Sequence, residues 1–225
     1  MLIFYFYIFQ KIDIFMEYNI KIKEFKNKLI GFDVIEDGIC QSLTKKILES
    51  ESYILNLGKP NYPNVPSNTI TSRHEYYNLL DFNWNELDIV KKSIIKNASN
   101  IIGGDKFLIK MWANIFRHNE CIKRHMHHPY PIKETETFKK NIFNTICGNL
   151  FLSNDYESYT IYHFENESRE ILNKSGEIYY FSCIVEHEVL PFKGNLRVGI
   201  AFDIYTESFF KNLGIRNPHN LRLIY

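Results

Sequence analysis

The chain has 225 residues, which suffices for one good-sized domain or one domain with a helical extension. It carries 27 Lys and Arg against 26 Asp and Glu, so its overall charge predicts no attraction to nucleic acid or to a membrane surface. The four cysteines are far apart and form no Cys-x-x-Cys pair, which argues against a disulfide framework or a structural zinc site. We therefore expect a protein of the cytoplasm, or of the host cytoplasm if its source is viral.

The N-terminus begins with an apolar run, Met1 to Phe9, that is too short to span a bilayer. No basic residue precedes this run and no small-residue cleavage site follows it, as a signal peptide would require. A sequence of ordinary composition begins at Met16. We predict that residues 1–15 are a non-native or disordered extension, with an extra edge strand as the alternative, and that residues 16–225 form a single domain.

The first elements predicted after Met16 are a strand and a helix. Apolar and polar residues alternate from about Tyr18 to Phe32, as in a half-buried strand. Asp37 is placed to cap a helix, since apolar residues recur behind it at helical spacing, namely Ile39, Leu43 and Ile47. The Pro- and Asn-rich segment 59–66 then predicts a surface loop.

A second helix is indicated by the spacing of Asn83 and Glu86, which is that of a capping box. Apolar residues follow every three or four positions from Leu87 to Ile101, and Gly103 and Gly104 are expected to end the helix.

The second half of the chain contains five segments with strand character, separated by turn-rich stretches: 107–116, 145–152, 159–164, 177–189 and 196–205. Helices followed by many antiparallel strands predict an α+β, mainly β protein. We expect a double-stranded β-helix (a cupin-like jelly roll) with the N-terminal helices packed on one sheet. Residues 16–105 would be the mixed support, 106–206 the jelly-roll core and 207–225 a short tail.

Two histidines two positions apart, His125 and His127, suggest a metal site. In an extended strand both would point to the same side, with Cα atoms about 6.6 Å apart. Imidazole suits iron, zinc, copper or nickel, and three ligands with open positions would make a catalytic site. His128 and Pro129 crowd this segment, so the sequence leaves open which histidines bind, and a solvated cluster is the alternative.

A second candidate segment runs from His187 to Arg197. It predicts a hairpin in which Gly194 adopts the left-handed conformation of a three-residue loop. His187 would then lie opposite Gly199, so that His187 and Arg197 face the same side, where Gly199 and Ala201 leave room for a ligand. The opposite face of the second strand is apolar and suits packing against the helices: Val198, Ile200, Phe202 and Ile204.

An arginine that faces the interior is costly unless it is paired. Its fork geometry binds a carboxylate through two hydrogen bonds. For Arg197 the partner would be either Asp203, on the same strand face, or a dicarboxylate cosubstrate whose other end chelates the metal.

Together these motifs resemble those of the 2-oxoglutarate/Fe(II)-dependent oxygenases, and most closely a phage- and bacteria-associated branch whose first motif is often His-x-His. The similarity spans about residues 70–205, and it lies in the order and spacing of six segments: Met111–Asn114, His125–His127, Gly148–Leu152, Gly176–Ser182, His187 and Arg197–Phe202.

The resemblance implies that Fe(II) is bound by His125, His127 and His187. It also implies that Arg197 holds the C5 carboxylate of 2-oxoglutarate, with ascorbate as an optional reductant. Three further residues on strands expected to line the pocket would be cosubstrate-binding: Trp112, Asn114 and Asn149. The substrate stays open between a peptide, a nucleobase and a small metabolite.

Two positions depart from the pattern of these oxygenases. His127 stands where the usual ligand is a carboxylate, which leaves the site more positive. Glu134 or Glu136 could supply a carboxylate instead. Gly199 stands two residues after the arginine, where many members have a hydroxylated side chain.

Two other functions fit the same residues. A cupin-like three-histidine metalloenzyme would use Arg197 for the carboxylate of its own substrate rather than for 2-oxoglutarate. A non-catalytic jelly-roll module, for binding or in a virion, would need no metal at all. The long charged segment 130–144 is expected to lie over the mouth of the site and to select the substrate. The sequence does not predict the oligomeric state.

Overall fold

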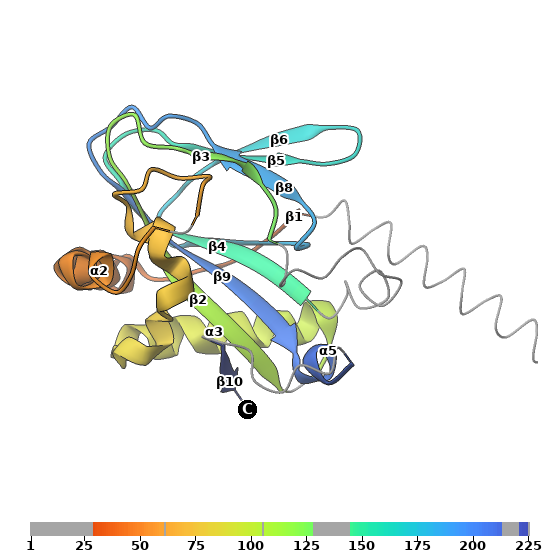
Figure 1. Cartoon of the computed structure of the whole chain (residues 1–225). Helices are drawn as coiled ribbons and strands as arrows, with labels where there is room; N and C mark the ends of the chain where they lie inside the picture. Colours follow the sequence, from red (N-terminus) through yellow and green to blue (C-terminus); the bar gives the residue numbers. More distant parts are fainter. Residues whose placement is uncertain (1–28, 61, 105, 128–144, 213–220, 225) are drawn as a thin grey trace, which may run out of the picture.

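The computed structural model describes residues 29–60, 62–104, 106–127, 145–212 and 221–224. Within these residues two antiparallel sheets lie face to face, and helices cover the outer side of the larger sheet (Figure 1). The predicted extension 1–15 and most of the first predicted strand lie outside the described residues. The double-stranded β-helix expected from the sequence is confirmed.

The larger sheet has six strands in the order β1-β7-β4-β9-β2-β10. Their bounds are β1 (Leu29–Val34), β7 (Glu177–Phe181), β4 (Thr145–Asn154), β9 (Arg197–Thr206), β2 (Phe107–Phe116) and β10 (Arg222–Ile224). The three long strands β4, β9 and β2 form its centre. The predicted apolar face of β9 is confirmed, since four side chains are buried in the core beneath the helices: Val198, Ile200, Phe202 and Ile204.

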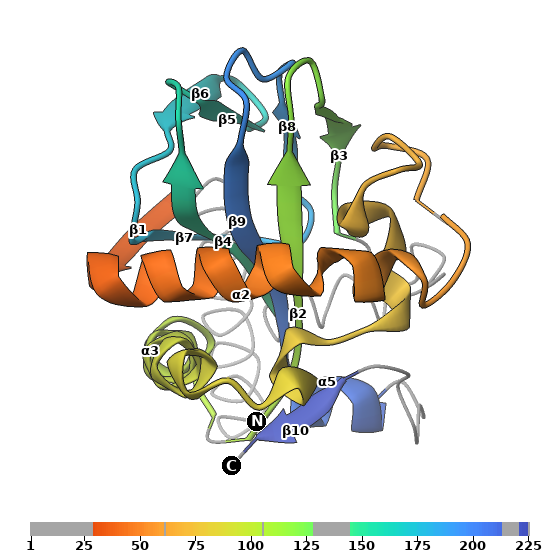
Figure 2. The same cartoon turned by 90° about the vertical axis from the view of Figure 1, so that its left-hand side faces the viewer.

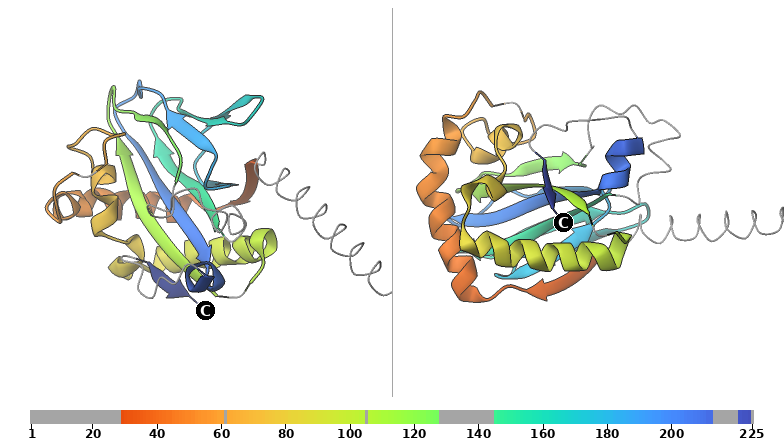
Figure 3. Two further views of the ribbon diagram at one scale, coloured as in Figure 1. Left: turned by 45° about the vertical axis from the view of Figure 1, so that its right-hand side comes forward. Right: turned by 90° about the horizontal axis from the view of Figure 1, so that it is seen from below.

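The helical layer consists of α2 (Asp37–Leu55), α3 (Asn85–Ile102) and the 3₁₀ helices η1 (Ile70–Tyr76) and η2 (Leu79–Phe82). Figure 2 shows α2 crossing the strands β4, β9 and β2 on one face. In Figure 3, α2 and α3 lie on the same side of this sheet and run in different directions. Both helices bury an apolar stripe at helical spacing in the shared core, and this burial holds them there.

The helix N-termini differ from the predictions in detail. Glu36 rather than Asp37 is the N-cap of α2, and its side chain makes no capping bond. The capping box predicted for Asn83 and Glu86 is also wrong, because Trp84 is the N-cap of α3. Glu86 instead accepts hydrogen bonds from Ser42 and Lys46 of α2, each at 2.6 Å, so its carboxylate joins the two helices.

The C-terminus of α3 lies where the sequence predicts it. Gly103 and Gly104 both adopt positive φ angles, 73° and 92°. Residues other than glycine rarely take this backbone conformation, so the pair ends the helix and directs the chain into β2.

The smaller sheet has the order β3-β8-β5-β6. Its strands are β3 (Ile122–His125), β8 (Glu186–Val189), β5 (Tyr159–His163) and β6 (Ser168–Leu172). The single strand predicted over 177–189 is wrong, because β7 belongs to the larger sheet and β8 to the smaller one. A turn in which Val185 N–H donates to the Ser182 carbonyl at 2.9 Å takes the chain between them.

The hairpin predicted between His187 and Arg197 is wrong for the same reason. β8 pairs with β3 and β5, whereas β9 pairs with β2 and β4. The connecting segment forms bonds elsewhere, since Asn119 N–H donates to the Phe192 carbonyl at 2.8 Å and Phe192 N–H to the Glu120 carbonyl at 3.0 Å. Gly194 is not left-handed; a Cβ there would lie 2.1 Å from a carboxylate oxygen of Asp155, so close approach is what requires glycine.

The C-terminal segment contains α5 (Glu207–Asn212) and β10, and β10 pairs antiparallel with β2 at the edge of the larger sheet. Among the described residues, no helix combines the length and the apolar character needed to cross a membrane.

Replacing Gly148 by Ala is expected to destabilise the fold by about 1–3 kcal/mol, the usual effect of overpacking. Gly148 lies in the middle of β4, and a Cβ there would come within 2.3 Å of the Phe202 ring and 2.7 Å of the Tyr179 carbonyl oxygen. Urea unfolding measures the effect. Gly38→Ala is the control, since no atom lies within 4 Å of its Cβ position, and equal unfolding midpoints for both variants would contradict the packing described here.

Candidate metal centre

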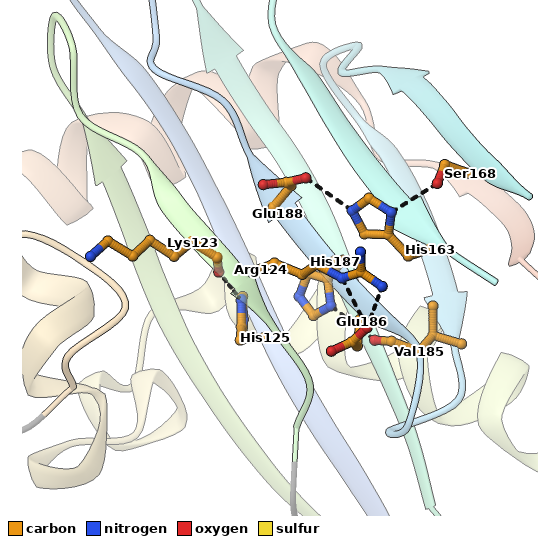
Figure 4. A network of polar contacts seen from close by, with 9 residues as sticks. All are labelled: Lys123, Arg124, His125, His163, Ser168, Val185, Glu186, His187 and Glu188. Carbon is orange, nitrogen blue, oxygen red and sulfur yellow. Dashed lines mark hydrogen bonds and ion pairs between the residues drawn. The ribbon is translucent and has the colours of Figure 1, made fainter. Parts of the chain in front are cut away.

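The three histidines predicted as metal ligands converge between the two sheets. His125 ends β3 and is the direct cross-strand partner of His187 in β8. His127 lies two residues beyond His125, where its N–H donates to the Cys183 carbonyl at 3.1 Å. One ring nitrogen from each histidine lies within 4.8 Å of the others, which is close enough for a single ion to bind all three. Figure 4 shows the rings of His125 and His187 next to each other.

The hydrogen bonds of these rings determine which nitrogen of each ring is free to bind an ion. Nδ1 of His125 lies 2.8 Å from the Lys123 carbonyl, and Nδ1 of His187 lies 3.2 Å from the Val185 carbonyl. Nδ1 of His127 lies 2.6 Å from a carboxylate oxygen of Asp203. Since each of these partners accepts, each Nδ1 carries the proton, and each Nε2 keeps a lone pair for a metal.

Burial keeps two of the rings uncharged. Desolvation, followed by the proximity of the other rings, lowers the pKa of His187 well below its ordinary value. The same two causes lower the pKa of His125 to about 4. A metal binds the neutral imidazole, so these rings need to lose no proton at neutral pH before they coordinate.

Asp203 is the residue at this centre whose partner the sequence analysis misjudged. Its carboxylate contacts His127, and its second oxygen accepts from the Tyr205 hydroxyl at 3.3 Å. Burial opposes its ionisation, but His127, the Cys147 thiol and Lys110 together outweigh burial and hold the pKa of Asp203 below its ordinary value. The alternative in which Asp203 pairs with Arg197 is wrong, since the two residues lie six positions apart along β9, or about 20 Å.

Arg197 is a buried cation, with only 6% of its surface exposed. One of its terminal nitrogens, Nη2, donates to the Thr160 hydroxyl at 3.2 Å, and the other, Nη1, is buried without a hydrogen-bond partner. Its guanidinium lies over the Phe116 and Phe151 rings, at 5.0 and 5.9 Å. Burial lowers its pKa to about 10, and no carboxylate among the described residues pairs with it. A buried cation without a paired anion is costly, so an anionic ligand bound here would be stabilised.

The three residues predicted to line the pocket differ in their contacts. The Trp112 ring lies 5.4 Å from that of His127, so Trp112 borders the histidine cluster. The amide oxygen of Asn114 accepts from Thr71 of η1 at 2.9 Å. The Asn149 amide donates to the Tyr162 hydroxyl at 3.1 Å. Both asparagines thus bond to protein groups, and their cosubstrate role stays a prediction.

Sequence reasoning missed four other residues near the centre. Tyr162 stacks on His187 with ring centroids 5.8 Å apart, and Thr160 contacts Arg197. Tyr62 and His74 extend the ring contacts, since Tyr62 lies 5.7 Å from His125 and His74 lies 5.5 Å from Trp112. They belong to segments without a recognisable motif, and only the tertiary contacts reveal them. The predicted alternatives Glu134 and Glu136, and the loop 130–144, lie outside the described residues.

No protein-family model matches the chain, and no curated protein matches it either. Solved structures do resemble it. A prolyl hydroxylase from Trichoplax adhaerens, in complex with a peptide fragment of the hypoxia inducible factor oxygen degradation domain, superposes with a TM-score of 0.59 at 12% identity, over 85% of this chain and 88% of that one. HygX from Streptomyces hygroscopicus, with nickel and 2-oxoglutarate bound, superposes with a TM-score of 0.57 at 10% sequence identity, over 81% of this chain and 84% of that one. A prolyl-4-hydroxylase from Pseudomonas putida superposes with a TM-score of 0.53 at 11% sequence identity, over 80% of this chain and 94% of that one.

These likenesses establish the class of fold. The chain has the double-stranded β-helix shared by 2-oxoglutarate/Fe(II) oxygenases, and its three clustered histidines lie between the two sheets of that fold. The phage- and bacteria-associated branch stays a prediction.

Proposed function

We propose that the protein is an Fe(II)/2-oxoglutarate-dependent dioxygenase, a hydroxylase that couples 2-oxoglutarate decarboxylation to oxidation of a substrate. The observation that carries this proposal is the environment of Arg197, a buried cation without a carboxylate partner among the described residues. The buried guanidinium of Arg197 has one nitrogen without a hydrogen-bond partner, and it shares a neighbour, Tyr162, with the histidine cluster. A ligand that joins the two sites would have a metal-chelating end and a carboxylate end, as 2-oxoglutarate has.

The donor set fits a catalytic ferrous ion. Three Nε2 atoms from His125, His127 and His187 would hold it and leave positions for other ligands. Ferrous iron with bound 2-oxoglutarate supplies the activation of dioxygen, which yields succinate, carbon dioxide and an oxidised substrate. The chain's own part is to orient these partners and to keep water away from them.

The other end of the cosubstrate would be held by Arg197 through two hydrogen bonds. Gly199 lacks the hydroxyl that many such oxygenases present near this arginine, but Thr160 of the opposite sheet places a hydroxyl 3.2 Å from the guanidinium. The rings of Phe116 and Phe151 cover the guanidinium and exclude water, which strengthens its attraction for a carboxylate. Thr160 would therefore replace the missing side chain at position 199.

Two comparisons support the cosubstrate and leave the substrate open. HygX, of the same fold, is described with nickel and 2-oxoglutarate bound. The Trichoplax prolyl hydroxylase is described with a peptide. A peptide is thus one candidate substrate beside a nucleobase and a small metabolite, and ascorbate is the reductant to include in assays.

Anaerobic titration of the protein with Fe(II), with and without 2-oxoglutarate, tests the proposal. We expect one equivalent of iron to bind, and 2-oxoglutarate to produce the weak visible charge-transfer band of an Fe(II)–keto acid complex. Iron binding without that band would overturn the proposal in favour of a cupin-like enzyme that uses three histidines without 2-oxoglutarate. If no metal binds, a non-catalytic jelly-roll module is the better description.

A further inference from the structure

We propose that Asp203 is the positioning residue of the metal centre, and that it supplies from behind His127 the negative charge that a three-histidine ligand set lacks. The inference rests on the proposed function for the identity of the metal. Its own content is the geometry of the contact between His127 and Asp203, which none of the sequence motifs discussed above predicts.

The geometry of the pair is that of a histidine ligand with its carboxylate partner. Oδ1 of Asp203 lies 2.6 Å from Nδ1 of His127, on the side of the ring away from Nε2. Oδ2 accepts from the Tyr205 hydroxyl at 3.3 Å, and the Cys147 thiol lies within 4.8 Å of the carboxylate. All of these groups are buried or nearly so, so the carboxylate is fixed in orientation and poorly screened by water.

His127 needs such a partner more than the other two ligands do. His125 and His187 lie on paired strands, and backbone carbonyls orient both rings. His127 lies beyond the end of β3, where the ladder no longer fixes its direction. The Asp203 contact comes from β9 in the other sheet, so it anchors this ring to a strand that is paired on both sides.

Asp203 itself does not replace a histidine as ligand. The ligand atoms that could hold one ion together are those of His125, His127 and His187, and the Asp203 carboxylate is not among them. It lies instead in a second group with His127 and Cys147. A contact of 2.6 Å between Nδ1 and the carboxylate is a hydrogen bond, since two ligand atoms on one ion lie farther apart than this at metal–ligand distances of about 2.0–2.2 Å. Asp203 therefore acts through His127.

The charge has a chemical consequence. A hydrogen-bonded carboxylate draws the Nδ1 proton toward itself and makes Nε2 a stronger donor. The imidazole–carboxylate pair then resembles an anionic ligand, and the site recovers much of the charge balance of a two-histidine, one-carboxylate centre. Lys110, the cross-strand neighbour of Asp203, places a cation near the carboxylate.

The test compares D203N with the wild type in binding Co(II) and, anaerobically, Fe(II). We expect D203N to bind either ion about 10- to 100-fold more weakly, the usual effect of losing such a partner. Glu188→Gln is the matched control, because Glu188 contacts His163 at 3.0 Å on the outer face of the smaller sheet (Figure 4) and should leave affinity within about twofold. Asp203→Glu, which keeps the charge, should bind more tightly than D203N.

Proton NMR of the Co(II) form separates positioning from mere packing. We expect three exchangeable, metal-shifted Nδ1–H signals in the wild type and in Glu188→Gln, and one of them moved or lost in D203N. Unchanged affinity and three unchanged signals in D203N would overturn the inference. So would complete loss of metal in D203N with the apo fold intact, because Asp203 would then be a ligand.

The outcomes also separate this inference from the proposed function. If the wild type binds no metal, the proposed function itself is contradicted. If the wild type binds metal and D203N binds it equally tightly, only the role of Asp203 is contradicted. If D203N fails to fold, the comparison of Asp203→Glu with Glu188→Gln decides: an unchanged Nδ1–H pattern in both would overturn the inference, and a shift of one signal in Asp203→Glu alone would support it.

Discussion

His187→Ala is expected to abolish stoichiometric Fe(II) binding. His187 is one of three converging candidate ligands. Losing only the outer partner of a ligand already costs about 10- to 100-fold in affinity, so losing a ligand should cost more than about 100-fold. Metal analysis after anaerobic loading and desalting measures the effect. With no iron bound, the visible band with 2-oxoglutarate should disappear as well.

The substitution also removes packing, because the His187 ring lies 4.7 Å from that of Phe181 and stacks on Tyr162. Thermal unfolding of the apo variant therefore has to show that it still folds. His163→Ala is the matched control, since this histidine lies in the same sheet and bonds Ser168 and Glu188 away from the cluster. A His187→Ala variant that keeps a full equivalent of iron would contradict the assignment of the centre.

Arg197→Met is expected to weaken 2-oxoglutarate binding while leaving Fe(II) binding intact. Removing one partner of a buried, hydrogen-bonded charge pair costs about 2–5 kcal/mol, which corresponds to roughly 30-fold or more in affinity. The charge-transfer band, titrated with 2-oxoglutarate at saturating iron, gives the affinity directly.

The same substitution should raise the stability of the apo protein. Arg197 has no carboxylate partner among the described residues and buries an unsatisfied nitrogen, so an apolar side chain of similar volume relieves a desolvation cost. Arg124→Gln is the control, because this exposed arginine pairs with Glu186 at the surface. Unchanged 2-oxoglutarate affinity in Arg197→Met would indicate that the cosubstrate binds elsewhere, and an unstable apo variant would indicate that Arg197 has a structural role.

Local patterns in the sequence predicted the two long helices, several of the strands and the residue types at the site. Periodicity predicts α2, α3 and the strand bounds of β2 and β9, because a buried stripe has a fixed repeat in each kind of element. The alternation along β9 correctly separates a helix-facing apolar side from an interior side with Arg197 and Asp203. The His-x-His spacing predicts that the rings of His125 and His127 lie together, although His127 itself lies beyond the end of β3.

Only the tertiary structure decided which strands pair and which charges meet. The segment between His187 and Arg197 has the pattern of a hairpin, yet it crosses from the smaller sheet to the larger one. A turn at Ser182–Val185 takes the chain into the smaller sheet, and Phe192 forms backbone hydrogen bonds with residues 119–120 instead of closing a hairpin. Pairing of β9 with β2 and β4 places Asp203 behind His127 and Arg197 beside Thr160, and no spacing within one strand contains that information. The sequence thus predicted the candidate ligands, whereas the fold determined which groups contact them, since these groups come from strands that are distant in the chain.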